Sequence, residues 1–175
     1  MIHYESDRLS LREIREEDAP FILEVLTDPD FIANVGDRGV HDLAAARSYI
    51  TGNVRASYRS HGFGLCLATL RASAEPLGIC GLLRRDTHPD VEIGFAFVPR
   101  ARGSGYALEA ARATMAFARH SLVLRRVVAL TAPHNQRAIE LLERLGFRHE
   151  RKLRFEAAGP EWQRRRLPEL PVVTR

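Results

Sequence analysis

The sequence contains little cysteine, almost no lysine and no long apolar run. Two cysteines, Cys66 and Cys80, are too few for the disulfide framework of a secreted domain, so we expect reduced core thiols. They are not spaced like a metal site, and no cluster of histidine and cysteine accompanies them. No segment approaches the roughly 18 apolar residues of a membrane span, and the first residues lack the basic and apolar regions of a signal peptide. These absences predict a cytoplasmic protein without membrane association or bound metal.

The most informative segment extends from Val91 to Glu109, where an apolar strand stops at Pro99 and a loop leads to a helix near Gly105. The first turn of a helix leaves about four backbone N–H groups unpaired, and the helix dipole adds about half a positive charge there. Gly103 and Gly105 carry no side chain that would keep a phosphate away from these donors. The segment therefore predicts an anion-binding cradle for a phosphate-bearing cofactor.

Two arginines, Arg100 and Arg102, add forked cationic donors to the same loop. The loop is not a Rossmann fingerprint, because Leu108 occupies the position of the third glycine. It is not a Walker A loop either, because the only lysine of the chain, Lys152, lies far downstream. Both of these nucleotide-binding motifs are therefore excluded.

Three motifs together resemble the GNAT superfamily of N-acetyltransferases. Arg100–Gly105 is similar to its Arg/Gln-x-x-Gly-x-Gly/Ala motif. Asn135–Ala138, followed by Leu141–Phe147, looks like its Asn-x-x-Ala/Ser and Glu-Lys/Arg-Leu-Gly-Phe signature. The opening Glu5–Arg12 is similar to the start of the branch that includes the ribosomal-protein N-terminal acetyltransferases. The resemblance covers residues 5–155, with the motifs in the order that the family has them.

The length of the chain predicts a single domain spanning residues 1–175. The resemblance implies an α/β (α+β) GNAT-type fold, with a mixed central sheet of about seven strands, helices on both faces, and splayed parallel strands at 91–98 and 126–131. Hydrophobic periodicity and turn residues place strands at 8–14, 64–70, 76–83, 91–98, 126–131, 147–154 and 163–167, and helices at 18–28, 42–60, 105–120 and 135–146.

The resemblance also implies acetyl-CoA as a co-substrate, with its pantetheine arm between the splayed strands and its diphosphate at the glycine turn. Backbone N–H groups near Phe97 and Val98, freed where the strands part, would polarise the thioester carbonyl. The residues expected to contact acetyl-CoA are Phe97, Val98, Arg100, Arg102, Gly103, Ser104, Gly105, Tyr106, Ala107 and Asn135.

Acetyl transfer requires a neutral amine, so a base that removes a proton is useful. Glu92 is our first candidate, because it interrupts an apolar strand and shares a face with the small residues Gly94 and Ala96. A salt-bridged carboxylate is the equally weighted alternative. His134 is the second candidate, with an ordinary loop histidine as the favoured alternative. Asn135 is expected to cap a helix and, from the resemblance, to contact the pantetheine arm or the acceptor.

The resemblance places Asn34, Asp37 and Arg38 beside the acceptor, which is an amine on a protein N-terminus or on a small molecule. The alternative is that the two glycines of this loop simply make a turn. The chain departs from the family pattern at Leu142 and Ala138, where many members carry a tyrosine or a serine. Neither residue can donate a proton to the leaving thiolate. A non-catalytic acyl-CoA-binding module is therefore the alternative function.

The formal net charge of +4 comes almost wholly from arginine, and Arg164–Arg166 forms a basic run near the C-terminus. A basic chain can bind nucleic acid, but no basic module interleaved with aromatic residues appears. We therefore favour a solvated strand edge and attraction for an anionic cofactor over nucleic-acid binding. The sequence leaves the oligomeric state open, including a homodimer.

Overall fold

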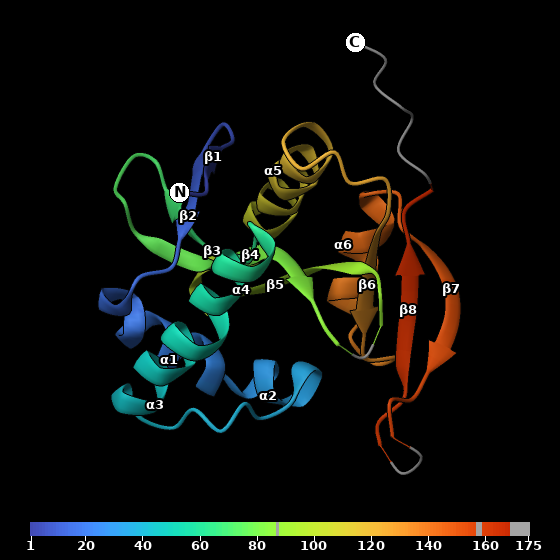
Figure 1. Ribbon diagram of the computed structural model, residues 1–175, viewed down its shortest axis with the longest axis horizontal. Helices are drawn as coiled ribbons and strands as arrows, with labels where there is room; N and C mark the ends of the chain where they lie inside the picture. The colour runs from blue at the N-terminus through green and yellow to red at the C-terminus, as the bar shows by residue number, and fades with distance from the viewer. Residues whose placement is uncertain (87, 157–158, 169–175) are drawn as a thin grey trace.

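The computed structural model describes residues 1–86, 88–156 and 159–168, so the end of the expected domain, 169–175, lies outside the described residues. An eight-stranded sheet runs through the molecule in the order β1-β2-β3-β4-β5-β6-β8-β7 (Figure 1). Its strands are β1 (His3–Glu5), β2 (Leu9–Glu13), β3 (Leu65–Leu70), β4 (Pro76–Arg84), β5 (Val91–Phe97), β6 (Val127–Thr131), β7 (Arg148–Leu153) and β8 (Trp162–Arg166).

The junction of β5 and β6 is the one parallel pairing in this sheet, and every other pair of neighbouring strands is antiparallel. The parallel register consists of Val91 opposite Val127 and Glu92 opposite Val128. Both strands continue well past these pairs, to Phe97 and Thr131, without pairing to each other. The predicted splayed parallel pair is thus confirmed, and its open end lies at the carboxyl ends of the two strands.

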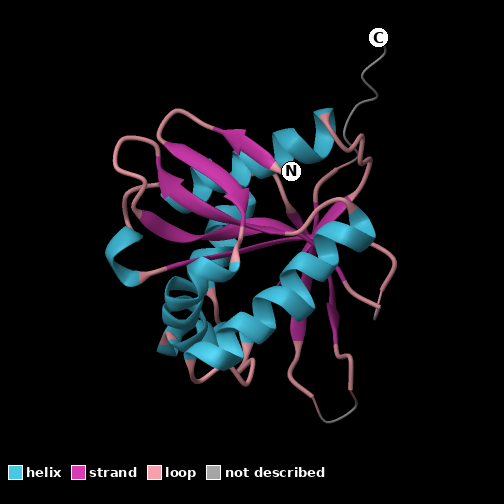
Figure 2. Cartoon of the chain, turned by 60° about the vertical axis from the view of Figure 1, so that its left-hand side comes forward, coloured by secondary structure: helices cyan, strands magenta, loops and turns pink. Residues whose placement is uncertain are grey.

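Helices cover both faces of the sheet, as predicted (Figure 2). The long α5 packs against β1, β2, β4 and β5. On the other side lie α1, α3 and α4, with α2 to the right of α1 and α3 in the view of Figure 1. The helices are α1 (Ala19–Thr27), α2 (Pro29–Val35), α3 (Leu43–Tyr49), α4 (Arg55–His61), α5 (Tyr106–His120) and α6 (Gln136–Arg144).

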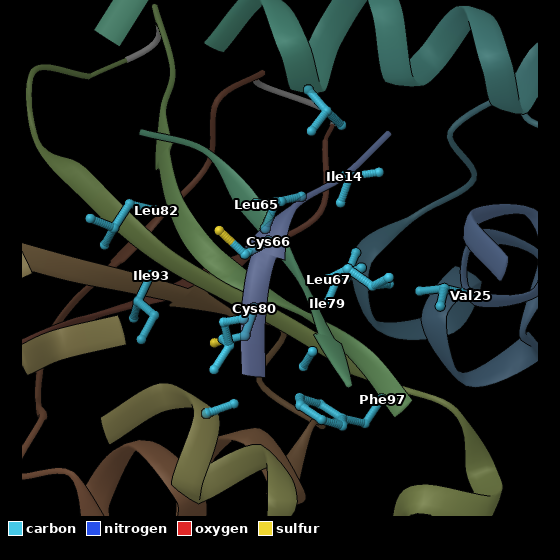
Figure 3. Packing of buried hydrophobic residues seen from close by; sticks show 14 of the residues in the cluster. Ile14, Val25, Leu65, Cys66, Leu67, Ile79, Cys80, Leu82, Ile93 and Phe97 are labelled. Carbon is cyan, nitrogen blue, oxygen red and sulfur yellow. The ribbon is translucent and has the colours of Figure 1, made fainter. Parts of the chain in front are cut away.

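The core is built from strands that are apolar on both faces, as expected where helices cover each side. Leu67 and Ile79 are directly opposite in the register of β3 and β4, as are Cys66 and Cys80 (Figure 3). Both cysteines are buried, and neither forms a disulfide. Cys80 Sγ lies 3.3 Å from Thr114 Oγ1 of α5. Burial raises the pKa of each thiol to about 12, so both thiols are protonated and inert at neutral pH.

Three local features differ from the sequence prediction. The short strand β1 was not predicted, because three residues carry too little periodicity to be recognised. The helix α2 was not among the predicted helices, and it begins directly after Asp28, whose Oδ1 accepts the N–H of Asp30, with Pro29 in its first turn. The helix predicted for 42–60 is divided into α3 and α4 by a π-helical turn, η2 (Ile50–Val54).

Candidate functional site

The glycine turn before α5 presents a run of free backbone donors. Gly103 and Gly105 adopt left-handed φ angles of 80° and 79°, which favour glycine, and no side chain caps α5. Among the described residues, no acceptor pairs with the N–H groups from Gly103 through Leu108. The helix dipole adds positive potential at the same place. The turn is therefore shaped to receive an anion, as the sequence predicted.

A polar network braces this turn from behind. Glu109 accepts hydrogen bonds from Ser6 Oγ at 2.7 Å, from the backbone N–H of Arg8 at 2.8 Å and from Arg8 Nε at 2.7 Å. Arg8 also donates to Ser104 O at 3.1 Å and lies over the Tyr106 ring. Burial raises the pKa of Glu109, but these hydrogen bonds outweigh it and lower the pKa below its ordinary value. Glu109 is therefore a charged brace.

Both arginines of the loop are engaged by acidic side chains. Arg100 ion-pairs with Glu24 and with Glu75, at 3.4 Å for Nε, and lies outside the cavity beside the turn. Arg102 pairs with Asp28 and with Asp30, at 2.6 Å for Nη1, and donates from Nε to Phe97 O at 3.0 Å. The expectation for Arg100 is thus corrected, because Glu24 and Glu75 engage it outside the cavity. Arg102 lines the cavity while it is paired, so its contact with a phosphate stays a prediction.

A cavity of about 650 Å³ opens beside the turn, between β5, α2 and α6. It is lined by eight of the residues expected to contact acetyl-CoA, namely Phe97, Val98, Arg102, Gly103, Gly105, Tyr106, Ala107 and Asn135. Ser104 is not part of its wall. Arg137 and Arg144 of α6, which the sequence analysis did not single out, also line it and supply cationic groups. Their spacing of seven residues on one helix is the signal that could have indicated them.

The backbone at the end of β5 corrects the prediction for Val98. Its N–H donates to Leu77 O at 3.1 Å, so it is not freed where the strands part. Because backbone groups alternate between the two edges of a strand, Phe97 turns its N–H toward the gap beside β6. Among the described residues no backbone acceptor is recorded for that N–H. Phe97, not Val98, therefore carries the free donor.

A second cavity, of about 830 Å³, lies on the other side of the gap between β5 and β6. Glu92 lines it, together with the predicted acceptor residues Asn34, Asp37 and Arg38. The two cavities share part of their walls, where β5, α2 and α6 approach one another. The shared residues are Phe31, Asn34, Val35, Phe95, Ala96, Asn135 and Ala138. A ligand in one cavity can therefore meet a ligand in the other at the open end of the splayed strands.

Glu92 has both properties weighed from the sequence, since it is ion-paired and also lines a cavity. Its side chain is 3% exposed, and its Oε1 lies 2.5 Å from His88 Nε2 and 2.9 Å from Arg85 Nε. The register of β4 and β5 places Glu92 on the face shared with Gly94 and Ala96, as predicted. His88 and Arg85 were not singled out from the sequence, because the turn between β4 and β5 shows no periodic pattern.

Comparison with known proteins identifies the family. A family model described as an acetyltransferase (GNAT) domain matches residues 8–148. The chain belongs to the GNAT acetyltransferase family. The uncharacterized N-acetyltransferase p20 of Bacillus licheniformis is 28% identical over 152 residues, with 85% of this chain and 84% of p20 covered. These matches confirm the family that the three sequence motifs resembled.

Solved structures agree with this assignment. The crystal structure of the acetyltransferase from Agrobacterium tumefaciens str. C58 superposes with a TM-score of 0.81 at 26% identity, covering 96% of this chain and 95% of that chain. The structure of RimL, a ribosomal L7/L12 α-N-protein acetyltransferase in complex with coenzyme A, superposes with a TM-score of 0.76. At 17% identity, with 92% of this chain and 94% of that chain covered, RimL shows the shared GNAT fold.

The remaining predicted residues of this GNAT chain lie in contrasting places. His134 is exposed and lines neither cavity, which agrees with an ordinary loop histidine. Asn135 caps α6, since its Oδ1 accepts the N–H of Ala138 at 3.2 Å, and it lines both cavities. Ala138 and Leu142 line the second cavity. Because both side chains are hydrocarbons, neither supplies a proton donor there.

Within residues 1–86, 88–156 and 159–168, no group of three or more histidine, cysteine, aspartate and glutamate side chains is arranged to hold a metal ion. No helix within these ranges is long and apolar enough to span a membrane.

Proposed function

We propose that this protein is an acetyl-CoA-dependent N-acetyltransferase that acts on a primary amine. The observation that carries the proposal is the shared wall of the two cavities at Phe95, Ala96 and Asn135. A thioester in the first cavity and an amine in the second are brought to the same point. The amine attacks the thioester directly, in a ternary complex, and the covalent chemistry is confined to the open end of the splay.

The first cavity suits the chemistry of coenzyme A. The free N–H groups from Gly103 through Leu108 are donors for a diphosphate. Arg144 adds positive charge at the same cavity, and so does Arg137, which also lies 3.6 Å from Asp30. The splay between β5 and β6 leaves room for the pantetheine arm, which Asn135 borders. The RimL structure, which shares the fold, is described as a complex with coenzyme A and supports the assignment.

Three contributions from the chain support catalysis. Glu92 accepts a proton from the acceptor amine, directly or through water, because an ammonium group has no lone pair for attack. The Phe97 N–H, directed at the gap, stabilises the negative charge that develops on the thioester oxygen. The cavities hold both reactants in line, an effect worth several kcal/mol. The leaving thiolate departs without a dedicated acid, since a thiol pKa is about 8.5.

The acceptor is an amine on a protein N-terminus or on a small molecule. The second cavity is open to both, and Asn34, Asp37 and Arg38 border it. An α-amine has a pKa of about 7.7–8.0, whereas a lysine side chain has a pKa of about 10.4. An acceptor of the first kind therefore needs less help from Glu92.

A second candidate function is supported by one observation. Ala138 and Leu142 line the second cavity without offering a proton donor, and this favours a non-catalytic acyl-CoA-binding module. The two functions agree on coenzyme A binding and differ in turnover. Release of free thiol from acetyl-CoA in the presence of an amine panel supports the enzyme, and tight binding without thiol release under any acceptor supports the module.

The glycine turn offers a sharp test of the cofactor site. We expect Gly103→Glu to abolish acetyl-CoA binding measured by calorimetry, because a carboxylate there repels the diphosphate and obstructs the donors. Gly62→Glu is the matched control, since Gly62 has a φ of 74° against 80° at Gly103 and an added Cβ meets nothing within 4 Å at either position. Both variants carry the same backbone strain, of about 1–2 kcal/mol.

The outcomes separate cleanly. Loss of affinity in Gly103→Glu, with normal affinity in Gly62→Glu, supports the turn as the diphosphate site. Equal affinity in the two variants overturns that placement. A protein that neither binds acetyl-CoA nor releases thiol with any amine contradicts both candidate functions.

A further inference from the structure

Three polar side chains meet beside the second cavity, which is the proposed acceptor cavity. Arg85 and His88 lie in the connection between β4 and β5, and both contact Glu92 of β5. The His88 side chain is 9% exposed and Glu92 is less exposed still. Burying a carboxylate costs several kcal/mol unless it is paired, and the neighbouring positions of β5 are apolar or glycine. The two partners therefore offset the cost of burying Glu92, and they hold its carboxylate at the wall of the second cavity.

The geometry shows which ring nitrogen of His88 faces Glu92. His88 Nε2 lies 2.5 Å from Glu92 Oε1, a distance at which one proton lies between the two atoms. Among the described residues, His88 Nδ1 is buried without a hydrogen-bond partner. Because a carboxylate oxygen can only accept, the ring nitrogen that faces it, Nε2, is the donor to Glu92 Oε1.

Two further contacts hold the pair in place. Arg85 Nε lies 2.9 Å from the same Oε1, so both partners converge on one oxygen of the carboxylate. The His88 ring stacks on Phe155, which follows β7, with a centroid distance of 6.3 Å and an interplanar angle of 21°. Because Phe155 also lines the acceptor cavity, the imidazole is fixed between that cavity wall and Glu92. Oε2 takes part in neither contact.

We infer that His88 is a positioning residue that fixes the Glu92 carboxylate so that Oε2 receives the proton of the acceptor ammonium group. The inference rests on the proposed function. The ammonium nitrogen gives one proton to Oε2, and its lone pair forms the C–N bond while the C–S bond breaks. The second proton leaves the nitrogen and ends on the thiolate. Glu92 then returns its proton to water, so that charge and atoms balance.

Two substitutions at His88 separate positioning from packing. His88→Leu keeps an apolar side chain against Phe155 but removes the donor, and we expect kcat to fall on the order of 10²-fold, as a misplaced catalytic group does. The KM for acetyl-CoA should not change. His88→Gln places an amide N–H near the position of Nε2, so most of the activity should return. His3→Leu, at an exposed histidine of β1, is the matched control and should behave as the unmodified protein.

A double substitution tests whether His88 acts through Glu92. Residues that act as one unit are strongly non-additive, so His88→Leu should cost nothing further in a Glu92→Gln background. Additive losses, or an unchanged kcat in His88→Leu alone, overturn the inference. A loss that His88→Gln does not rescue overturns it as well, because packing alone then explains the effect.

A readout that does not need turnover separates this inference from the proposed function. Long-range ¹H–¹⁵N spectra of the imidazoles should show a proton on His88 Nε2, with a signal that shifts in Glu92→Gln. An Nε2 without a proton, or no response to Glu92→Gln, overturns the inference. Absence of thiol release by the unmodified protein with every amine contradicts the proposed function, whereas normal turnover in His88→Leu contradicts only the role of His88.

Discussion

At the scale of single residues, the two acidic side chains Glu92 and Glu109 have opposite surroundings. Glu109 is held by Ser6 and Arg8 behind the glycine turn and lines neither cavity. Glu92 is held by two partners at one oxygen and also lines the acceptor cavity. A base must reach the acceptor, so it must line the cavity that holds the acceptor. Glu92 does so and Glu109 does not, which makes Glu92 the candidate base.

The pH dependence of turnover tests this role. We expect Glu92→Gln to lower kcat/KM most at pH values below the pKa of the acceptor amine. There the acceptor is mostly an ammonium ion and needs a base. The measurement is the pH–rate profile for one amine, with the exposed Glu17→Gln as a control that keeps the normal profile. A Glu92→Gln profile parallel to that of the unmodified protein would remove Glu92 from the role.

The sequence predicted those site features that depend on neighbouring residues. The left-handed glycines, the Asn135 cap and the alternation of Glu92 with Gly94 and Ala96 are all local. Features that depend on distant partners could not be read. Arg102 is engaged by acidic residues more than 70 positions earlier in the chain, and no local pattern predicts such a pairing.

At the scale of elements, the first turn of α5 combines the free donors with a brace from the N-terminal strands. Glu109 sits in that turn, and its hydrogen bonds to Ser6 and Arg8 tie α5 to the segment between β1 and β2. A carboxylate in the first turn also complements the helix dipole. The brace therefore holds the donors in a fixed geometry while leaving their N–H groups free.

The brace should contribute to stability in a pH-dependent way. Although burial raises the pKa of Glu109, its hydrogen bonds lower it below the ordinary value of 4.5. Its contribution is therefore present above the unfolded pKa and is lost as pH falls through the lower folded pKa. We expect Glu109→Gln to reduce the free energy of unfolding by about 1–2 kcal/mol near neutral pH, and by much less at about pH 3.

Urea denaturation at the two pH values measures this difference. Glu5→Gln is the matched control, because Glu5 lies in β1 and forms only surface ion pairs with His3 and Arg71, which contribute little. A deficit in Glu109→Gln of equal size at both pH values would show that the charge of Glu109 is not what stabilises the turn.

At the scale of the whole molecule, the sheet consists of two parts, β1–β5 and β6–β8, that meet at one short parallel register. Asp90, just before β5, is close to Arg164 Nη2 at 2.5 Å and to Arg126 Nε at 3.0 Å. These ion pairs join the two parts at the closed end of the splay. The opposite end stays open, and both cavities meet there.

The strand β7, at one edge of the sheet, carries basic side chains. β7 is an edge strand whose side chains are almost all exposed, with Arg148, Arg151 and Lys152 among them. Charged side chains on an edge strand oppose pairing with other chains. The overall topology followed from the order of the sequence elements and the family resemblance. The two cavities could not be predicted in this way, because they depend on how α2 and α6 pack beside the gap between β5 and β6.

A crystal structure of the protein with coenzyme A tests the central claim most directly. We predict that the diphosphate lies on the N–H groups from Gly103 through Leu108 and that the pantetheine arm passes between β5 and β6. Its sulfur should lie at Phe95, Ala96 and Asn135, facing the cavity that Glu92 lines. Coenzyme A bound elsewhere, or a glycine turn left empty at saturating concentration, would contradict the account.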